Sequence, residues 1–279
     1  MTSGPRAFGA LRRLARKCVE PIPVLNRTLL YSAGYRVLSR QQAVEYEQRA
    51  VGWNSARSAK RQEDAYDQVL TQMRDGQPRI DFSTAAEAVR SCGLVSPSFL
   101  DVGCGSGYYA EVIPALGGGA LNYLGVDYSE AMIERARQRY PAKTFKVADA
   151  TQLPFDDGSF DIVFNGVALM HILNYPAALS EMARVAKRFA IIHCVPVVES
   201  CETAYLSKYA YGAPVLEIIF NRQELERRIA DLGMEIVSVL PSLDYDVFRV
   251  LGHHSKKLTY LCRCPPATRP NEAIGDSRV

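Results

Sequence analysis

The stretch Phe99-Leu-Asp-Val-Gly-Cys-Gly-Ser-Gly107 decides the fold that we predict for this chain. An apolar run contains the acidic residue Asp101, and three glycines follow at alternate positions, Gly103, Gly105 and Gly107. Glycine lets the backbone turn with positive φ and approach a ligand closely. A helix that starts after such a turn has free N–H groups at its first residues. The stretch therefore predicts a buried strand, a tight turn that binds a ligand, and a helix.

Apolar runs alternate with helical patterns on both sides of this stretch, and this alternation indicates βαβ units and a parallel sheet. We predict an α/β fold: a doubly wound, Rossmann-like sheet of seven mostly parallel strands, with helices on both faces and a helical N-terminal extension. The predicted strands are residues 98–102, 122–126, 144–147, 160–165, 189–194, 235–240 and 257–262. The predicted helices are 106–116, 130–139, 177–186, and one that runs from the N-cap Asn221 to about Leu232.

Composition divides the chain into regions. Residues 1–44 form a basic N-terminal arm, and residues 45–95 read as a helical extension or lid. Residues 96–264 form the main domain. Within it, residues 195–220 interrupt the alternation and are predicted to be an insertion or lid above the carboxyl ends of the strands, where open α/β sheets bind ligands. Residues 265–279 read as a flexible tail.

Charge and cysteine content exclude several classes of protein. The 279 residues include 33 Lys and Arg and 30 Asp and Glu, and the net charge of +3 argues against nucleic-acid binding through bulk positive charge. The sequence contains no run of about 20 apolar residues, so we predict no membrane span. The seven cysteines form no CxxC pair, so we expect reduced thiols in a cytoplasmic protein and no metal site.

Two acidic residues follow the glycine-rich stretch at positions suited to a nucleoside. Asp127 ends the second predicted strand, where a carboxylate accepts hydrogen bonds from ribose hydroxyls, as it also does in NAD-binding proteins. Asp149 ends the third strand, beside the same pocket. The glycine spacing argues against NAD, because a dinucleotide fingerprint has its third glycine one place later, where this chain has Tyr108.

Four segments together resemble the class I S-adenosylmethionine (SAM)-dependent methyltransferases, in particular the small-molecule group related to ubiquinone and menaquinone methyltransferases. They lie between about Phe99 and Ile172, and they read LDVGCGSG, GVDYSEAMIERAR, VADATQLPFDDGSFDIVF and ALMHI. The resemblance implies SAM as cofactor, S-adenosylhomocysteine (SAH) as product, and a small-molecule acceptor. It implies no nucleic-acid partner.

The resemblance also implies a role for individual residues. The three glycines would line the methionine part of SAM, and Asp101 would orient its amino-acid end. Asp127 would hold the ribose, while Asp149 and the Ala150 backbone would bind adenine. Asn165 or Gly166 would offer a backbone carbonyl near the SAM ammonium group. Tyr128 would cover one face of the adenine or merely pack. For Asp101 and Asp149 the alternatives are a helix cap and a local structural role, and Asp161 is expected to be structural.

His171 is the candidate general base among four histidines, because it follows the fourth strand, in the loop beside the transferred methyl group. The alternative is that it packs or holds a backbone carbonyl. We expect His193 to be a hydrogen-bonded core residue, and His253 and His254 to lie outside the site. Trp53 in the first lid either stacks on a ligand or is buried against the main domain.

The expected reaction is methyl transfer to a small molecule, with oxygen as the favoured atom. Transfer to nitrogen or carbon, including a quinone carbon, is the first alternative, and a SAM-binding module without activity is the second. A nicotinamide-dependent oxidoreductase and an RNA methyltransferase fit the motifs less well. The basic arm has three interpretations: a solvated arm, a weak contact with an anionic membrane surface or acidic partner, or a transit peptide. The sequence leaves the oligomeric state open.

Overall fold

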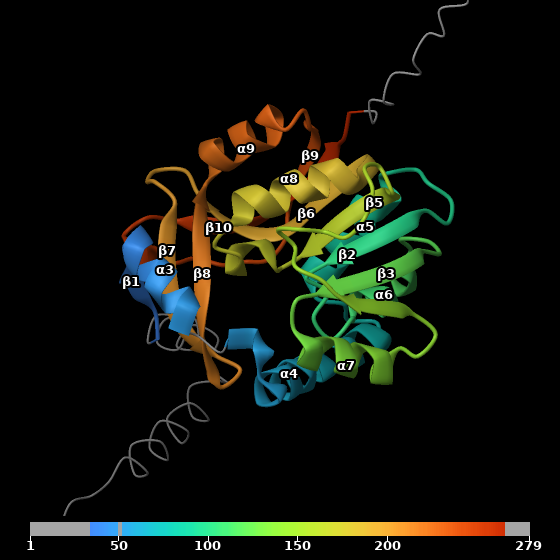
Figure 1. Cartoon of the computed structure of the whole chain (residues 1–279), viewed down its shortest axis with the longest axis horizontal. Coiled ribbons are helices and arrows are strands. Elements are labelled where there is room, and N and C mark those ends of the chain that lie inside the picture. The colour runs from blue at the N-terminus through green and yellow to red at the C-terminus, as the bar shows by residue number, and fades with distance from the viewer. Residues whose placement is uncertain (1–33, 50–51, 266–279) are drawn as a thin grey trace, which may run out of the picture.

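The computed structural model describes residues 34–49 and 52–265. Its centre is a sheet in which seven strands have the order β4-β3-β2-β5-β6-β10-β9 (Figure 1). The first five are parallel to one another, and β10 runs antiparallel between β6 and β9. These strands are β2 (Ser98–Val102), β3 (Asn122–Asp127), β4 (Thr144–Val147), β5 (Phe160–Gly166), β6 (Ala186–Val198), β9 (Glu235–Pro241) and β10 (Ser255–Arg263). The predicted mostly parallel sheet is confirmed at these seven strands, but the whole sheet has ten within the described residues.

Three further strands extend this sheet beyond its predicted size. β7 (Ala204–Ala210) and β8 (Ala213–Asn221) form an antiparallel hairpin, and β1 (Arg36–Leu38) pairs with β7. β8 joins the sheet through the last two residues of β6. The prediction that the fifth strand ends at Cys194 was therefore wrong, because the apolar run that follows continues the strand to Val198. Most of the predicted insertion 195–220 is thus sheet.

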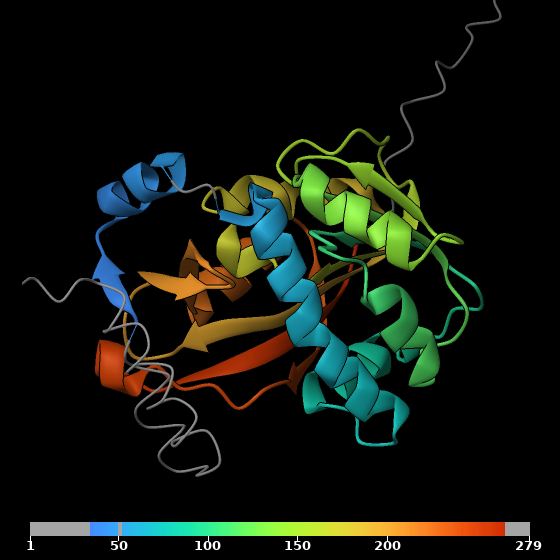
Figure 2. The ribbon, with the colours of Figure 1, turned by 90° about the horizontal axis from the view of Figure 1, so that it is seen from below.

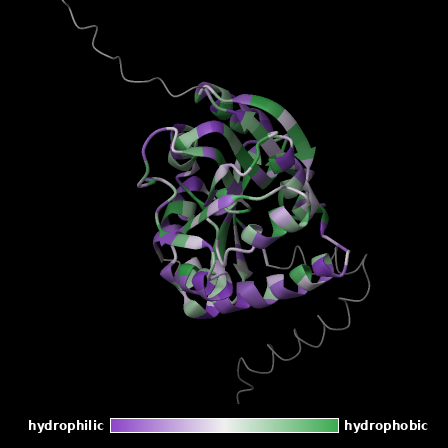
Figure 3. Cartoon of the chain, turned by 90° about the vertical axis from the view of Figure 1, so that its right-hand side faces the viewer, coloured by the Kyte–Doolittle hydropathy of each residue, from purple (hydrophilic) through white to green (hydrophobic). Residues whose placement is uncertain are grey.

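Helices cover both faces of the sheet, as predicted. One face carries α8 (Tyr175–Val185) and α9 (Arg222–Asp231), whose apolar residues belong to one buried cluster. The other face carries α4 (Ala56–Arg74), α5 (Ile80–Arg90), α6 (Tyr109–Ala115) and α7 (Glu130–Arg139), which share a second cluster. Figure 3 shows the hydrophobic residues mainly toward the centre and many hydrophilic ones on the outer helices. The remaining helices among the described residues are α3 (Arg40–Arg49), η2 (Gly52–Asn54), η3 (Leu169–His171) and α10 (Phe248–Leu251).

Local sequence signals explain where two of these helices begin. The Asn221 side chain accepts a hydrogen bond from the Glu224 N–H, which confirms the predicted N-cap of α9. The prediction that a helix starts at Ser106 was wrong by three residues. Gly107 has φ 80°, a left-handed conformation that a right-handed helix excludes, and α6 begins only at Tyr109.

The N-terminal extension lies across the edge of the sheet where the parallel strands end. In Figure 2 the long blue helix α4 crosses the molecule between the β7–β8 hairpin and α7. It is tied to α7 by the ion pair of Glu63 with Arg135, and the Arg61 side chain packs directly on Gly212 in the hairpin. The basic arm predicted for residues 1–44 falls mainly on residues outside the described range, as does nearly all of the tail predicted for 265–279. None of the helices in the described part of the chain is long and apolar enough to cross a membrane.

Candidate functional site

The glycine turn lies at the carboxyl end of β2 and is held against β3. The N–H groups of Gly103 and Cys104 both donate to the Val126 carbonyl, at 2.8 and 2.9 Å. All three glycines have positive φ, between 54° and 80°. A Cβ at Gly107 would lie 2.7 Å from the Phe145 ring, and one at Gly103 would lie 2.5 Å from the Ala168 side chain. Only glycine fits these two positions, because the backbone of the turn packs directly against the Phe145 and Ala168 side chains.

Asp127 is fixed directly beside this turn. Its Oδ2 accepts the Gly105 N–H and its Oδ1 accepts the Ser129 N–H, each at 2.9 Å. The side chain is only 8% exposed, and burial raises its pKa although both hydrogen bonds favour the carboxylate. A carboxylate oxygen accepts more than one hydrogen bond, so each oxygen keeps capacity for a hydroxyl donor. This geometry fits a ribose whose two hydroxyls face Asp127.

Asp101 lies behind the turn and is fully buried. Its Oδ2 accepts a hydrogen bond from the Tyr123 hydroxyl at 2.6 Å, whereas its Oδ1 has no partner among the described residues. Burial raises the pKa of Asp101 to about 7. A buried oxygen without a partner has capacity to accept a hydrogen bond from an N–H donor, which is compatible with the predicted role of Asp101 at the amino-acid end of the cofactor.

Asn165 joins the ends of two neighbouring strands. Its Nδ2 donates to the Val102 carbonyl at 2.9 Å, and its Oδ1 accepts the Leu169 N–H at 2.8 Å. The side chain is completely buried and therefore serves the backbone of β2 and η3. Its predicted cofactor contact involves the main-chain carbonyl and is separate from these two bonds.

The three residues predicted around adenine follow the ends of β3 and β4. Tyr128 is 48% exposed, and a backbone group of Trp53 hydrogen-bonds to it. Asp149 is exposed, and its Oδ1 accepts both the N–H and the hydroxyl of Thr151 at 2.8 Å. The Ala148 N–H donates to the Asp127 carbonyl at 3.0 Å, which brings the segment that carries Asp149 and Ala150 beside Asp127. The structure thus gathers the predicted cofactor residues at one edge of the sheet.

The N-terminal extension contributes a residue that sequence reasoning missed. Gln62 on α4 lies over the glycine turn, where its Oε1 accepts the Ser106 hydroxyl at 3.2 Å. A Cβ at Gly105 would lie 2.9 Å from Gln62 Nε2. Gln62 is 44 positions from Ser106, and no motif around it signals a ligand, so only the packing of α4 reveals this contact.

His171 lies in η3 and faces the hairpin. Its Nδ1 is 2.5 Å from the Leu216 carbonyl, which can only accept, so Nδ1 carries the proton and Nε2 keeps a lone pair. Burial lowers the pKa of His171 to about 4, although the charge of Glu217 opposes this shift. The Trp53 ring lies 5.3 Å from the imidazole, and the Tyr211 ring lies 5.4 Å from Trp53. The half-buried Trp53 therefore packs on the candidate base, and its carbonyl accepts the Ser129 hydroxyl at 2.9 Å.

Comparison with known proteins shows what the segment that contains the glycine turn, Asp127 and His171 is similar to. Residues 100–194 match the family model described as a methyltransferase domain. A demethylmenaquinone methyltransferase of Staphylococcus aureus is 30% identical over 134 residues, which are 46% of this chain and 56% of that protein. Residues 100–194 are therefore similar to a methyltransferase domain. The chain spans about half the length of the curated relatives it matches.

Solved structures agree with the fold of this methyltransferase domain. A SAM-dependent methyltransferase from Clostridium acetobutylicum is 13% identical, with a TM-score of 0.52 over 72% of this chain and 98% of that one. The cyclase SpnF is 17% identical, with a TM-score of 0.52 over 66% of this chain and 81% of its own. These likenesses show the fold alone. Because SpnF is a cyclase, the fold by itself does not determine the reaction.

The other residues singled out from the sequence lie apart from the glycine turn of the methyltransferase domain. Asp161 is structural as expected, since its Oδ2 accepts the N–H and hydroxyl of Ser98 at 3.0 and 2.7 Å. His193 is a buried core residue bonded to Thr259. His253 and His254 contact Ser200 and Asp246, at 2.9 and 2.7 Å, near α10.

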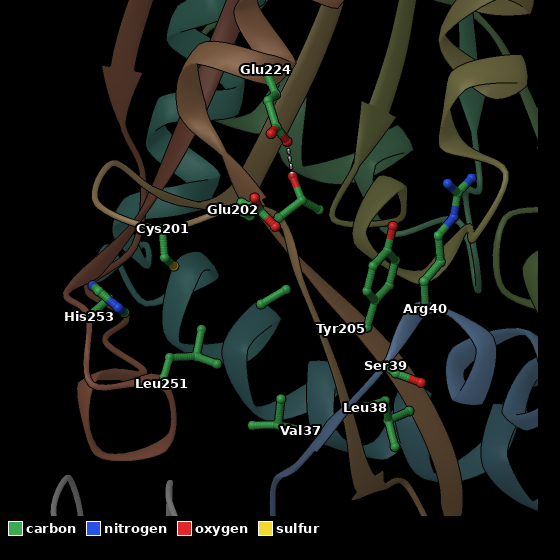
Figure 4. Close-up of a pocket in the computed structure, with 12 residues that line it drawn as sticks. Val37, Leu38, Ser39, Arg40, Cys201, Glu202, Tyr205, Glu224, Leu251 and His253 are labelled. Atoms are coloured by element: carbon green, nitrogen blue, oxygen red, sulfur yellow. Dashed lines mark hydrogen bonds between the residues drawn. The ribbon is translucent and has the colours of Figure 1, made fainter.

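A separate groove of about 820 Å³ opens along β1, β7 and α10 (Figure 4). None of the predicted cofactor or catalytic residues lines it. Polar side chains from several elements border the groove, among them Arg40, Glu202, Glu224 and His253. The Thr203 hydroxyl donates to Glu224 at 2.7 Å, so part of this lining is already paired within the chain.

Proposed function

We propose that this chain transfers the methyl group of SAM to a hydroxyl oxygen of a small-molecule acceptor. The observation that supports oxygen is the state of His171, whose Nδ1–H is held by the Leu216 carbonyl while Nε2 keeps its lone pair. A hydroxyl must lose its proton when its oxygen is methylated, so a base that is neutral at physiological pH suits this acceptor. The lowered pKa keeps His171 neutral there.

The residues around the glycine turn fit the cofactor. Gly103, Gly105 and Gly107 would hold the methionine part against the backbone, and Asp127 would accept the ribose hydroxyls. Gln62 adds an amide over the turn, close to where a carboxylate or ammonium group of the cofactor would lie. Bound SAM supplies a methyl group activated by its positively charged sulfur. The protein need only align the acceptor in line with that methyl group and exclude water.

His171 Nε2 would take up the proton that the hydroxyl of the methyl acceptor loses. An imidazole with a pKa of about 4 is a weak base, so the imidazolium that forms must be stabilised. Glu217 supplies this stabilisation: it is fully buried, and despite burial the charge of Lys208 lowers its pKa to about 2. Glu217 is therefore ionised, and its charge favours the protonated form of His171. Trp53 covers the imidazole and limits access of water.

A second candidate is transfer to carbon, because the Staphylococcus aureus relative is a demethylmenaquinone methyltransferase. A quinone-type acceptor would also suit the aromatic side chains of Trp53 and Tyr211 near His171. Transfer to nitrogen and a SAM-binding module without activity are the remaining alternatives. A base at His171 favours oxygen over nitrogen as the methylated atom, since a neutral amine needs no base before attack.

The test is a screen with SAM that carries a labelled methyl group. Purified protein is incubated with panels of hydroxylated, amine and quinol acceptors, and the labelled product is analysed for the bond formed. We expect label in a methyl ether, and loss of that product in His171→Gln. Label found only on nitrogen or on ring carbon would contradict the oxygen proposal. Binding of SAM without turnover on any panel would favour the non-catalytic module.

A further inference from the structure

A buried group of metal-ligand side chains joins α5 to β6, apart from the glycine turn. Asp81, His193 and Cys194 each offer one ligand atom, and these atoms all lie within 4.8 Å of one another. The three residues are at most 1% exposed. We propose that this cluster binds one divalent transition-metal ion of the zinc class. The proposal is independent of the methyl-transfer reaction.

The hydrogen bonds around His193 indicate which of its ring nitrogens can bind a metal ion. Its Nδ1 lies 2.8 Å from the Thr259 hydroxyl, which also accepts the Cys194 N–H at 3.2 Å and contacts the Ser242 hydroxyl. If Thr259 donates its proton to Ser242, it accepts from both Cys194 N–H and His193 Nδ1–H, and every one of these groups is satisfied. This arrangement leaves Nε2 unprotonated, and Nε2 has no partner within residues 34–49 and 52–265. An unpaired buried nitrogen is costly, and a metal ion would satisfy it.

The surroundings of the cluster resemble the outer shell of a metal site. A ligating histidine is usually oriented by a hydrogen bond to its other ring nitrogen, as Thr259 provides here. Ligating carboxylates are likewise hydrogen-bonded, and Arg79 donates to both oxygens of Asp81 at 2.6 Å. A second buried group without a described partner, the Tyr109 hydroxyl, belongs to a ring 5.6 Å from the His193 ring.

The donor set selects the class of ion. One thiolate, one imidazole and one carboxylate are ligands that zinc accepts, whereas magnesium and calcium prefer oxygen alone. Cys194 binds as the thiolate, so its S–H bond is replaced by a sulfur–metal bond and one proton is released to solvent. Cys194 also has φ 59°, a strained conformation for a residue with a side chain, and such strain gathers at functional sites.

The position of the cluster indicates a structural ion. His193 pairs in register with Gly166 at the end of β5, and its carbonyl accepts the Val167 N–H at 3.1 Å. An ion held here would fix α5 to β6 beneath the strand end that carries the cofactor site. Three side chains fill three of the four positions that zinc prefers, and the fourth would be held by water or another buried donor. All three side chains are buried, so substrate does not reach the ion.

The test uses the full chain stripped with a chelator and then titrated with Co²⁺, a spectroscopic substitute for zinc. We expect one equivalent to bind, with visible d–d bands and a near-ultraviolet sulfur-to-cobalt charge-transfer band. Zinc should displace the cobalt and raise the melting temperature. No charge-transfer band in the folded wild-type protein would overturn the proposal, whatever the behaviour of variants.

Variants assign the ligands. Cys194→Ser should abolish the charge-transfer band, and His193→Gln should abolish stoichiometric binding. Thr259→Val should weaken metal affinity by about 10–100-fold, because it removes the group that orients the histidine. The matched control is Cys262→Ser, a buried thiol outside the cluster, which should leave the cobalt spectrum unchanged. A spectrum that survives in Cys194→Ser and disappears in Cys262→Ser would refute the assignment.

Discussion

Asp127→Ala tests the proposed recognition of the cofactor ribose, and it should also change the stability of the fold. The substitution removes the carboxylate proposed to hold the ribose, so SAM and SAH should bind about 1–3 kcal/mol more weakly, which is about 5- to 150-fold in Kd. It also leaves the N–H groups of Gly105 and Ser129 without their acceptor. A buried donor left unpaired costs about 1–3 kcal/mol, so the variant should also be less stable.

A matched control distinguishes these two effects. Asp161→Ala also removes a carboxylate that accepts two hydrogen bonds, here from Ser98, at the opposite end of the parallel strands. We expect it to lower the free energy of unfolding while leaving the Kd for SAM within about two-fold of the wild type. The hydrogen bonds that it removes are far from the proposed cofactor site, and effects at distant sites are usually independent.

The assay is isothermal titration of each folded variant with SAM, SAH and NADH, together with urea unfolding. Wild-type protein should bind SAM and SAH and should not bind NADH. Equal SAM affinity in folded Asp127→Ala and wild-type protein would refute the ribose role. A comparable loss of affinity in Asp161→Ala would show that binding merely follows stability.

Four further predictions rest on particular contacts. His171→Gln should lower kcat by about 10²–10⁴-fold without changing the Kd for SAM, as expected for a general base; a small decrease would contradict that role. An NMR titration should place the pKa of His171 at about 4. Between pH values of about 4 and 6.5 the unfolded chain then binds more protons than the folded protein, so this residue's contribution to stability should be lost as pH falls through that window. A measured pKa at or above about 6.5 would exclude the buried neutral imidazole. Gly107→Ala should destabilise the protein more than Gly119→Ala by about 1–3 kcal/mol, since both glycines have positive φ but only a Cβ at Gly107 meets a ring, that of Phe145 at 2.7 Å; equal melting temperatures would disprove the steric argument. Glu217→Gln should cost about 3–5 kcal/mol in urea unfolding because it leaves Lys208 without its buried partner, whereas Glu235→Gln, in the exposed pair with Arg263, should cost at most about 1 kcal/mol; similar costs for both would argue against a buried ion pair.

The positions of the core strands could be predicted from the sequence because each is a short apolar run bounded by turn residues. β2 and β4 have the predicted bounds, and Asn221 caps α9 as its side chain suggested. The glycine turn and Asp127 could be identified as a unit since their chemistry is local: a tight turn needs glycine, and a strand end places one carboxylate beside it. The structural role of Asp161 was expected from its place at the start of a strand, but its partner Ser98 lies 63 positions away in the chain and was not predicted.

Only the tertiary structure decided the features that depend on residues far apart in the chain. The apolar residues after Cys194 gave no sign that they would continue β6 and pair with a hairpin, because a continuous apolar run suits several partners. The tautomer of His171 depends on a carbonyl 45 positions away, and the place of Gln62 depends on how α4 crosses the strand ends. Asp81, His193 and Cys194 meet only because α5 packs on β6, and no spacing between them in the sequence records that contact. Local propensity and pattern determined the elements, whereas the packing of those elements determined which polar groups face one another.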